Sequence, residues 1–253
     1  MDTHDTRSRG SQPATWLCAA AIAIALAPQA ARAADAVAAF TESPGGKPPA
    51  PWRVSGLPNQ KKPFTQFAVE RWDGEAALRL EADKSYGNLI HPLAATQALH
   101  HLSWRWQLDE PNPLADLREK STEDVAVRVC VLFDLPDDKI PLGDRAMLKI
   151  ARSAHGGRVP GATVCYVWDQ KLPPGTALHS PFTSRIRMLV LRGQESPAHA
   201  WVGERRDIDA DFKQLFGDES DVVPPVIGVG VGADADNTKG RSLAHVGTLQ
   251  LQP

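Results

Sequence analysis

The stretch LSWRWQL, residues 102–108, decides the fold class because polar and apolar residues alternate along it. One face of the extended chain carries Leu102, Trp104, Trp106 and Leu108, and the other carries Ser103, Arg105 and Gln107. Strict alternation over this length is typical of a half-buried β-strand. We therefore predict a strand whose two tryptophans point into a hydrophobic core.

The same pattern recurs along the chain. In DVAVRVCVLF (124–133) four valines and Phe133 share one face, and Asp124, Arg128 and Cys130 lie on the opposite one. Further strand-like runs are FTQFAVE (64–70), AALRLEA (76–82), ATVCYVW (162–168), RIRMLVL (185–191), VIGVGVG (226–232) and VGTLQLQ (246–252). Eight or so strands in about 200 residues predict an all-β protein, a two-sheet sandwich or jelly roll.

One short helix interrupts this pattern in DIDADFKQLFG (207–217). We predict that Asp209 caps it and that Gly217 ends it in the left-handed conformation. Segments 136–148 and 152–162 are predicted as long loops. Residues 34–63 are rich in Pro and Gly and predict an irregular edge segment, which leaves 64–253 as a single β-sandwich domain.

The N-terminus has the features of a secretory signal. Arg7 and Arg9 precede an apolar run over residues 16–27, and the small-residue pattern Ala-Arg-Ala ends at Ala33. We predict a signal peptide over residues 1–33 and a periplasmic or secreted protein. The apolar run is too short to span a bilayer as a helix, so no transmembrane anchor is expected after cleavage.

Charge and cysteine content narrow the partners. The 28 basic and 30 acidic side chains nearly balance, and no basic cluster long enough for a phosphate backbone exists, so nucleic acid is not expected as a partner. After cleavage two cysteines remain, Cys130 and Cys165. Their spacing leaves open a disulfide or two buried free thiols.

The loop GADADNTKGRS (232–242) is the first candidate site. Asp234, Asp236, Asn237 and Thr238 follow a strand, and such residues form a plain turn, a polar ligand site or, through Asp234 and Asp236, a calcium site. The glycine and terminal glutamate of a calcium-loop template are missing. Because these template features are missing, calcium is only an alternative for this loop, and no other cofactor is expected.

The glycines of the preceding strand leave a strip without side chains. Gly228, Gly230 and Gly232 share one face, and we predict that a large core residue such as Trp168 or Tyr166 fills it, with a ligand groove as the alternative.

The second candidate segment is GERRDID, where Glu204 and Arg206 share a face and predict an ion-paired network. We expect Asp124 and Arg128 to join this network, because a buried arginine needs a carboxylate. The alternative pairs Glu204 with Asp234 as two facing carboxyls that act on a glycosidic bond.

Five blocks together resemble a known family. LSWRWQL, EDVAVRVCVLF, CYVW, WVGERRDIDADFKQLFG and VGVGADADNTKGRSLAHVG are similar, in this order, to the bacterial family catalogued as domain of unknown function 3047, over roughly residues 52–251. The resemblance implies a secreted or periplasmic β-rich domain and no established activity. The closing strand pattern is also similar to galactose-binding-like jelly rolls.

These observations favour an exported β-sandwich that binds a saccharide or another polar cell-envelope ligand and carries out no chemistry. The candidate ligand-binding residues are Asp124, Arg128, Glu204, Arg206, Asp234, Asp236, Asn237 and Thr238. The alternatives are a glycan-active hydrolase or lyase that uses Glu204 and Asp234, and a structural envelope protein.

Overall fold

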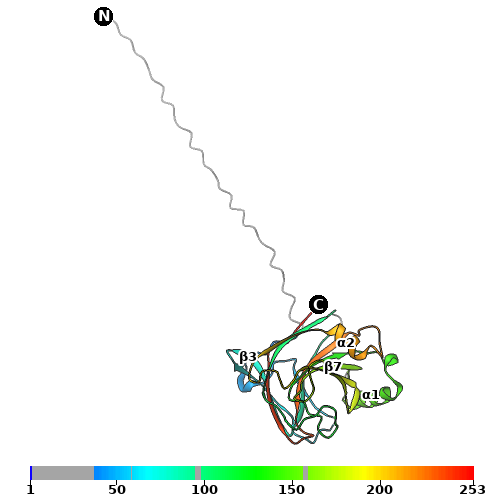
Figure 1. Ribbon diagram of the computed structural model, residues 1–253. Coiled ribbons are helices and arrows are strands. Elements are labelled where there is room, and N and C mark those ends of the chain that lie inside the picture. Colours follow the sequence, from blue (N-terminus) through cyan, green and yellow to red (C-terminus); the bar gives the residue numbers. More distant parts are fainter. Residues whose placement is uncertain (2–36, 58, 95–97, 156–158) are drawn as a thin grey trace. The chain divides into compact units, whose positions relative to one another are not determined.

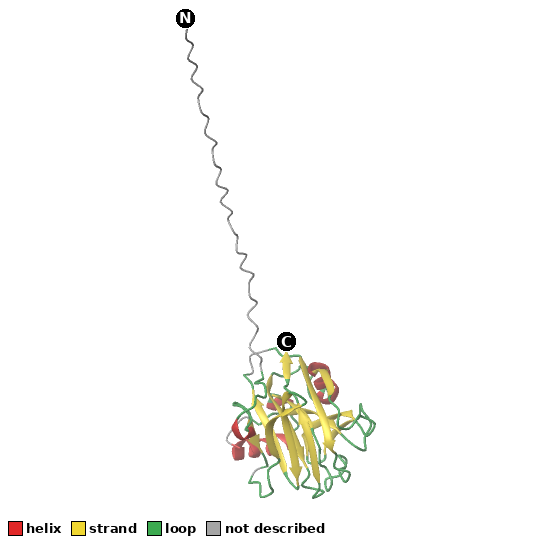
Figure 2. Ribbon diagram, turned by 90° about the vertical axis from the view of Figure 1, so that its left-hand side faces the viewer, coloured by secondary structure: helices red, strands yellow, loops and turns green. Residues whose placement is uncertain are grey.

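The computed structural model describes residue 1 and residues 37–57, 59–94, 98–155 and 159–253. The predicted signal peptide, apart from Met1, lies outside the described residues. The described residues from 37 on form one compact unit, in which strands make up the bulk and the helices lie at the periphery (Figure 1, Figure 2).

Thirteen strands, two α-helices and two short 3-10 helices make up the described part of the chain. The strands are β1 (Arg53–Ser55), β2 (Gln66–Trp72), β3 (Glu75–Asp83), β4 (Tyr86–Pro92), β5 (His101–Glu110), β6 (Arg128–Phe133), β7 (Ala162–Trp168), β8 (Ala177–Ser180), β9 (Thr183–Arg192), β10 (Val202–Asp207), β11 (Val226–Asp234), β12 (Arg241–Val246) and β13 (Gln250–Gln252). The helices are α1 (Leu142–His155), α2 (Ile208–Phe216), and the 3-10 turns Pro44–Gly46 and Asp137–Lys139.

The strands form two sheets. One has seven strands in the order β1-β4-β11-β6-β7-β9-β8. The other has six, of which five follow the order β10-β5-β12-β3-β2 and the sixth, β13, pairs with β5 beside this path. All pairs are antiparallel except β7 with β9. The predicted two-sheet, all-β architecture is confirmed.

The core lies between the sheets. Trp104 and Trp106 of the six-stranded sheet are buried and meet Tyr166 and Trp168 of the seven-stranded sheet, with ring centroids 5.2 and 5.7 Å apart. The inward orientation predicted for both tryptophans is confirmed. Large aromatic side chains bury much apolar area and dominate such a core.

The glycine strip of β11 faces away from the core, on the outer side of the seven-stranded sheet. A Cβ at Gly230 would lie 2.7 Å from Ile90 Cδ1, and one at Gly232 would collide with Asn88 and Arg128. Neighbouring strands therefore fill the strip, and the prediction that Trp168 or Tyr166 fills it is wrong. Those two side chains point to the opposite face, into the core.

Cys130 and Cys165 are directly opposite each other on β6 and β7 and form a disulfide. Of the two alternatives left open by the sequence, the structure has the bridge. The sulfurs lie on the outer face of the seven-stranded sheet, within a second apolar cluster that includes Val125, Val167 and Met188.

The strand predicted over 124–133 is shorter than expected. It begins at Arg128, and Val125 is instead bound through its N–H to Asp234 Oδ1 and through its C=O to Asp234 N, so it leaves the regular ladder. Val125 therefore packs beside the disulfide, whereas Val127 lies in the core.

Helix α2 is present where the sequence predicts it, but its ends differ. Asp207, not Asp209, caps it by accepting hydrogen bonds from the N–H groups of Asp209 and Ala210. Gly217 is right-handed, with φ of −63°, because its N–H donates to Lys213 O and continues the helical pattern.

The prediction of a single α-helix is wrong, because the structure has a second one, α1. It covers residues 142–148 of the first segment predicted as a loop and residues 152–155 of the second. Residues 144–152 are mostly Ala, Met, Leu, Lys and Arg, which favour a helix. Gly143 and the flanking prolines obscured that preference. No helix in the described ranges is long and apolar enough to cross a membrane.

Candidate functional site

Arg128 and Asp234, two residues nominated from the sequence, form a buried ion pair where β6 begins and β11 ends. Arg128 Nη1 donates to Asp234 Oδ2 at 2.8 Å, and Arg128 Nε donates to Asn88 Oδ1 at 3.1 Å. The other oxygen of Asp234 accepts from the Val125 N–H at 2.5 Å. Because both carboxylate oxygens of Asp234 and two nitrogens of Arg128 are bound inside the protein, this pair holds two strands together.

Asp124 organises the loop that follows β11. Its carboxylate accepts from the N–H of Asn237 at 3.1 Å, and from the N–H and hydroxyl of Thr238 at 2.8 and 2.6 Å. Asn237 Nδ2 donates in return to Glu123 O at 2.8 Å. The loop is thus a turn, yet its amides bind a carboxylate from a distant segment rather than their own Asp side chains.

The two calcium candidates, Asp234 and Asp236, are each paired with a positive side chain. Asp234 is paired with Arg128, and Asp236 is paired with Lys62. Within the described ranges, no group of three or more His, Cys, Asp or Glu side chains could hold a metal ion. Calcium would therefore have to displace two positive side chains.

Glu204 and Arg206 lie on β10, away from the residues above. Glu204 accepts from Trp106 Nε1 at 3.0 Å and from Arg192 Nε at 2.6 Å, which joins the two sheets at one edge. Arg206 is paired with Asp211 of α2.

Two predictions about this segment are therefore wrong. Asp124 and Arg128 share no network with Glu204 and Arg206. Glu204 and Asp234 belong to different sheets, each bound to its own arginine, and do not face each other as a catalytic pair. Alternation along a strand predicts the face of a side chain but not its partner across the fold.

Glu123 is a buried carboxyl of this region whose pKa lies near neutrality. Burial, reinforced by the negative charge of Asp234, raises the pKa of Glu123 to about 7. Its Oε1 accepts a hydrogen bond from Ser180 Oγ at 3.1 Å. A carboxyl in this environment is largely protonated below neutral pH.

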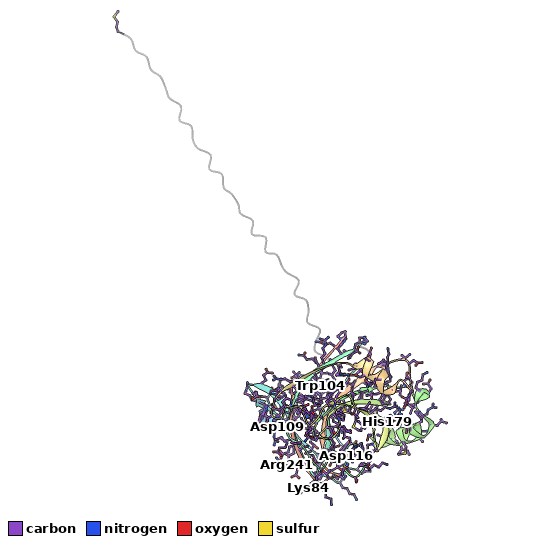
Figure 3. All side chains as sticks on the ribbon, in the orientation of Figure 1. Lys84, Trp104, Asp109, Asp116, His179 and Arg241 are labelled. Atoms are coloured by element: carbon purple, nitrogen blue, oxygen red, sulfur yellow. A yellow bond between two sulfur atoms is a disulfide. The ribbon has the colours of Figure 1, made fainter. Side chains whose placement is uncertain are left out.

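A second group of polar and aromatic side chains lies on the outer face of the six-stranded sheet. The Trp72 indole of β2 stacks on the His245 imidazole of β12, with centroids 4.0 Å apart and planes 11° apart. His245 Nδ1 is 2.7 Å from Asp109 Oδ2, and His245 Nε2 is 2.9 Å from Glu70 Oε1. We call Glu70, Trp72, Asp109 and His245 the outer-face site; Asp109 is labelled in Figure 3.

The two carboxylates set the charge of His245. Burial lowers the pKa of His245, but the hydrogen bonds with Asp109 and Glu70 outweigh this and raise it above its usual value. Burial likewise raises the pKa of Asp109, and hydrogen bonds from His245 and Gln107 outweigh it, so that pKa is lowered. Both shifts favour an imidazolium that donates from both nitrogens, which also strengthens its stacking on Trp72.

Trp201 lies at the opposite edge of the six-stranded sheet and contacts residues on the same outer face. It lies just before β10, and its Nε1 donates to Asp73 Oδ2, in the β2–β3 turn, at 3.0 Å. Because β10 and β2 are the two edge strands of the path, this contact requires the sheet to curl toward its outer face. The Arg105 guanidinium lies 4.5 Å from the centroid of the Trp201 ring.

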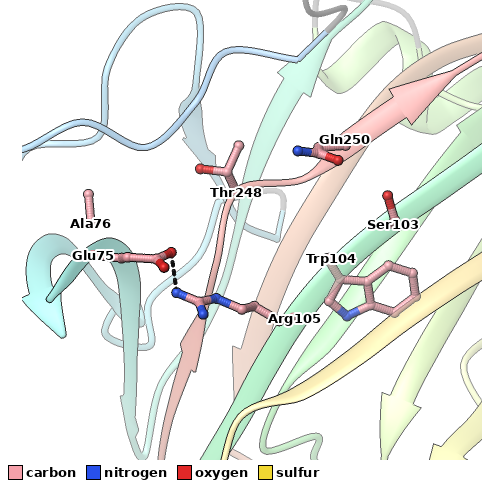
Figure 4. Close-up of a pocket in the computed structure, with 7 residues that line it drawn as sticks. All are labelled: Glu75, Ala76, Ser103, Trp104, Arg105, Thr248 and Gln250. Carbon is pink, nitrogen blue, oxygen red and sulfur yellow. Dashed lines mark hydrogen bonds and ion pairs between the residues drawn. The ribbon is translucent and has the colours of Figure 1, made fainter. Parts of the chain in front are cut away.

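A pocket of about 360 Å³ opens where β12 leaves β3 and the chain continues into β13. Its lining includes Glu75, Ser103, Arg105, Thr248 and Gln250 (Figure 4). Trp104, which lies between Ser103 and Arg105 on β5, also borders it. The pocket and the outer-face site occupy the same curled face, joined by Trp72 and Glu75, which are paired across the hairpin.

The sequence offered a partial signal for these residues. Trp72 lies two residues beyond Glu70, on the same face of the extended chain as Gln66 and Glu70, and His245 lies within a strand. His245 has no neighbouring residues at metal-ligand spacing, so its residue type alone does not single it out. Its two carboxylate partners lie 136 and 175 residues away in sequence, so no local pattern joins them.

Comparison with known proteins identifies the family. The family model described as a protein of unknown function, DUF3047, matches residues 50–250, and the chain belongs to that family. No curated protein matches the chain.

Solved structures resemble it only weakly. One is the carbohydrate-binding module TmCBM61 in complex with β-1,4-galactotriose, 11% identical over 80% of this chain and 88% of that one, with a TM-score of 0.33. The K2 cleaved adhesin domain of Lys-gingipain is 10% identical over 87% and 100%, with a TM-score of 0.40. The Trichoderma harzianum endoglucanase 3 of family GH12 is 10% identical over 81% and 99%, with a TM-score of 0.39. At such scores these likenesses carry no argument about function.

Proposed function

We propose that this member of the DUF3047 family is an exported protein that binds a saccharide on the curled outer face of its six-stranded sheet. The observation that carries the proposal is the Trp72 indole, which lies flat on His245 and remains partly exposed. A flat aromatic surface held rigidly on a strand packs against the apolar C–H face of a sugar ring.

Polar groups of fixed orientation surround this platform. Glu70 is 38% exposed at its side chain and accepts hydrogen bonds, and Arg105 donates them from the neighbouring pocket. Binding sites for small polar ligands combine an apolar surface with a few such groups, which select the orientation of the ligand. The combination suits a molecule with ring C–H groups and many hydroxyls.

Export is part of the proposal and is supported by the chemistry of the chain. The Cys130–Cys165 disulfide suits an oxidising compartment, such as the periplasm or the exterior of the cell. The signal-like N-terminal sequence points the same way. The ligand would then be a saccharide of the envelope or of the surroundings.

Binding without chemistry is favoured over glycan hydrolysis. Hydrolysis of a glycosidic bond uses one carboxyl that protonates the leaving group and a second that activates water or attacks. Glu70 and Asp109 are both engaged by His245, so neither offers a free proton.

The test is affinity gel electrophoresis of the purified protein in gels that contain a galactan, a glucan or polygalacturonate. We expect at least one polysaccharide to retard the protein, and Trp72→Ala and Trp201→Ala each to weaken that binding about three- to tenfold, the scale of a lost aromatic contact. Phe182→Ala is the matched control, because Phe182 is an exposed aromatic in the turn between β8 and β9, two strands of the other sheet.

Three outcomes would contradict the proposal. The first is that none of the three polysaccharides retards the protein. The second is that both tryptophan variants bind as well as the wild type while circular dichroism shows them folded. The third is that the protein releases reducing ends from the bound polysaccharide. The third outcome would favour the hydrolase, and the first would favour a structural envelope protein.

A further inference from the structure

The pocket beside the outer-face site is rich in hydrogen-bond donors. Arg105 supplies a guanidinium, Ser103 and Thr248 supply hydroxyls, and Gln250 supplies an amide. Glu75 is the one anionic side chain in the lining. We propose that the pocket takes the carboxylate of an acidic saccharide, with Arg105 as the group that binds it. This inference rests on the proposed function, because the pocket lies on the same face.

Arg105 is held in a defined position. Its guanidinium lies over Trp201 at 4.5 Å and donates to Glu75 Oε2. A Cβ at Gly247 would lie 2.8 Å from Arg105 Cγ, so the glycine leaves the room that the arginine stem uses. Gly203, opposite Arg105 on β10, has open space above it. The guanidinium therefore lies at the wall of an accessible pocket.

The ion pair with Glu75 shows that the Arg105 guanidinium can bind a carboxylate. The fork of an arginine matches the planar geometry of a carboxylate, and here a carboxylate of the protein itself occupies that position. The Glu75 side chain is 66% exposed, whereas that of Arg105 is 33% exposed. An exposed ion pair contributes little to stability, so a ligand carboxylate can replace Glu75.

The other lining groups suit the rest of a sugar acid. Hydroxyl and amide groups of Ser103, Thr248 and Gln250 donate and accept hydrogen bonds without charge, as sugar hydroxyls require. Trp201 lies beside Arg105 and adds an aromatic surface. A hexuronic acid unit presents all three features, namely a carboxylate, hydroxyls and a ring with C–H groups.

The experiment measures binding by calorimetry, in buffer with a chelator, of an oligogalacturonate and of a neutral galacto-oligosaccharide of equal length. We expect the wild type to prefer the acidic oligomer. Arg105→Gln should weaken the acidic oligomer roughly 10- to 100-fold, the usual cost of a lost charged hydrogen bond, and change the neutral one little. Glu75→Gln should strengthen the acidic oligomer about two- to fivefold, because it removes the competing carboxylate.

The controls are Arg241→Gln and Glu110→Gln, which break an exposed ion pair elsewhere on the same sheet and alter net charge identically. These variants should leave the preference unchanged. An increase in affinity caused by Glu75→Gln cannot arise from misfolding. This variant therefore keeps the test decisive if Arg105→Gln is unstable.

Equal affinity of the wild type for both oligomers, or a preference that survives Arg105→Gln, would overturn the inference while leaving saccharide binding intact. Tighter binding of a sulfated galacto-oligosaccharide than of the oligogalacturonate would overturn the assignment to a carboxylate. Absence of binding to every oligomer would instead overturn the proposed function.

Discussion

Arg128 and Asp234 form an ion pair that is almost completely shielded from solvent, with side chains 9% and 2% exposed. The pair joins the first residue of β6 to the last residue of β11. Removing one member leaves an uncompensated buried charge, which costs far more than the pair itself contributes.

Replacement of Arg128 by Ala should therefore lower the free energy of unfolding by about 3 to 5 kcal/mol. Urea unfolding followed by circular dichroism measures this change. The control is Arg118→Ala, which removes an exposed partner of Asp116 and should cost about 1 kcal/mol or less. Similar losses for the two variants would show that burial of the Arg128 pair has no energetic consequence.

Glu123 should make stability fall as pH rises. Its pKa is raised from 4.5 to about 7 in the folded protein, so the folded state holds a proton that the unfolded state has released between these values. The stability that protonation supplies is present below pH 4.5 and is lost as pH rises through 7, in total about 3 kcal/mol.

Glu123→Gln should remove this part of the pH dependence, because the amide stays neutral at every pH. Unfolding free energies at pH 4.5 and 7.5 for the wild type and the variant provide the measurement. An unchanged difference between the two pH values in Glu123→Gln would place the titration on another group.

The alternation of residues predicts what lies on each face of a strand but not which strands are neighbours. Trp104 and Trp106 are in the core because their own strand requires it. By contrast, β11 inserts between β4 and β6, which are far from it in sequence, and no local pattern specifies that choice. The fold class was therefore predictable, and the strand order was not.

The sequence made one of the two candidate regions predictable and not the other, for the same reason. Asp124, Asn237 and Thr238 could be nominated because short polar runs after strands are visible in the sequence, yet their mutual hydrogen bonds span 113 residues or more. Trp72 of β2 and His245 of β12 contact each other only because β3 aligns these two strands on one face of the sheet. Aromatic and charged residues on outward positions of several strands are the signal that would have identified that face.

The disulfide should contribute substantially to stability. It closes a loop with a sequence separation of 35 residues, and the chain entropy removed from the unfolded state is worth about 3 to 4 kcal/mol. The double variant Cys130→Ala, Cys165→Ala should unfold at correspondingly lower denaturant, as should the reduced wild type. If reduction does not change the unfolding midpoint, the bridge is not formed in the purified protein.

His245 should couple saccharide binding to pH. Its pKa is raised in the folded protein, so the stabilising contacts with Asp109 and Glu70 are fully present below about pH 6.5 and are lost as pH rises through the folded value. Loss of the proton removes one of the two donated hydrogen bonds and loosens the base on which Trp72 lies. We expect affinity for the retarding polysaccharide to fall from pH 6 to pH 9.

His245→Gln tests the cause of this dependence. Glutamine keeps a polar side chain but cannot titrate or donate to both carboxylates as an imidazolium does, so the variant should bind weakly and with little change over the same pH range. Glu123→Gln is the control, because Glu123 lies in the other candidate region and its replacement should leave the pH dependence of binding intact. A wild-type affinity that is constant from pH 6 to 9, or a His245→Gln variant that keeps the full decline, would show that the imidazolium does not support the Trp72 platform.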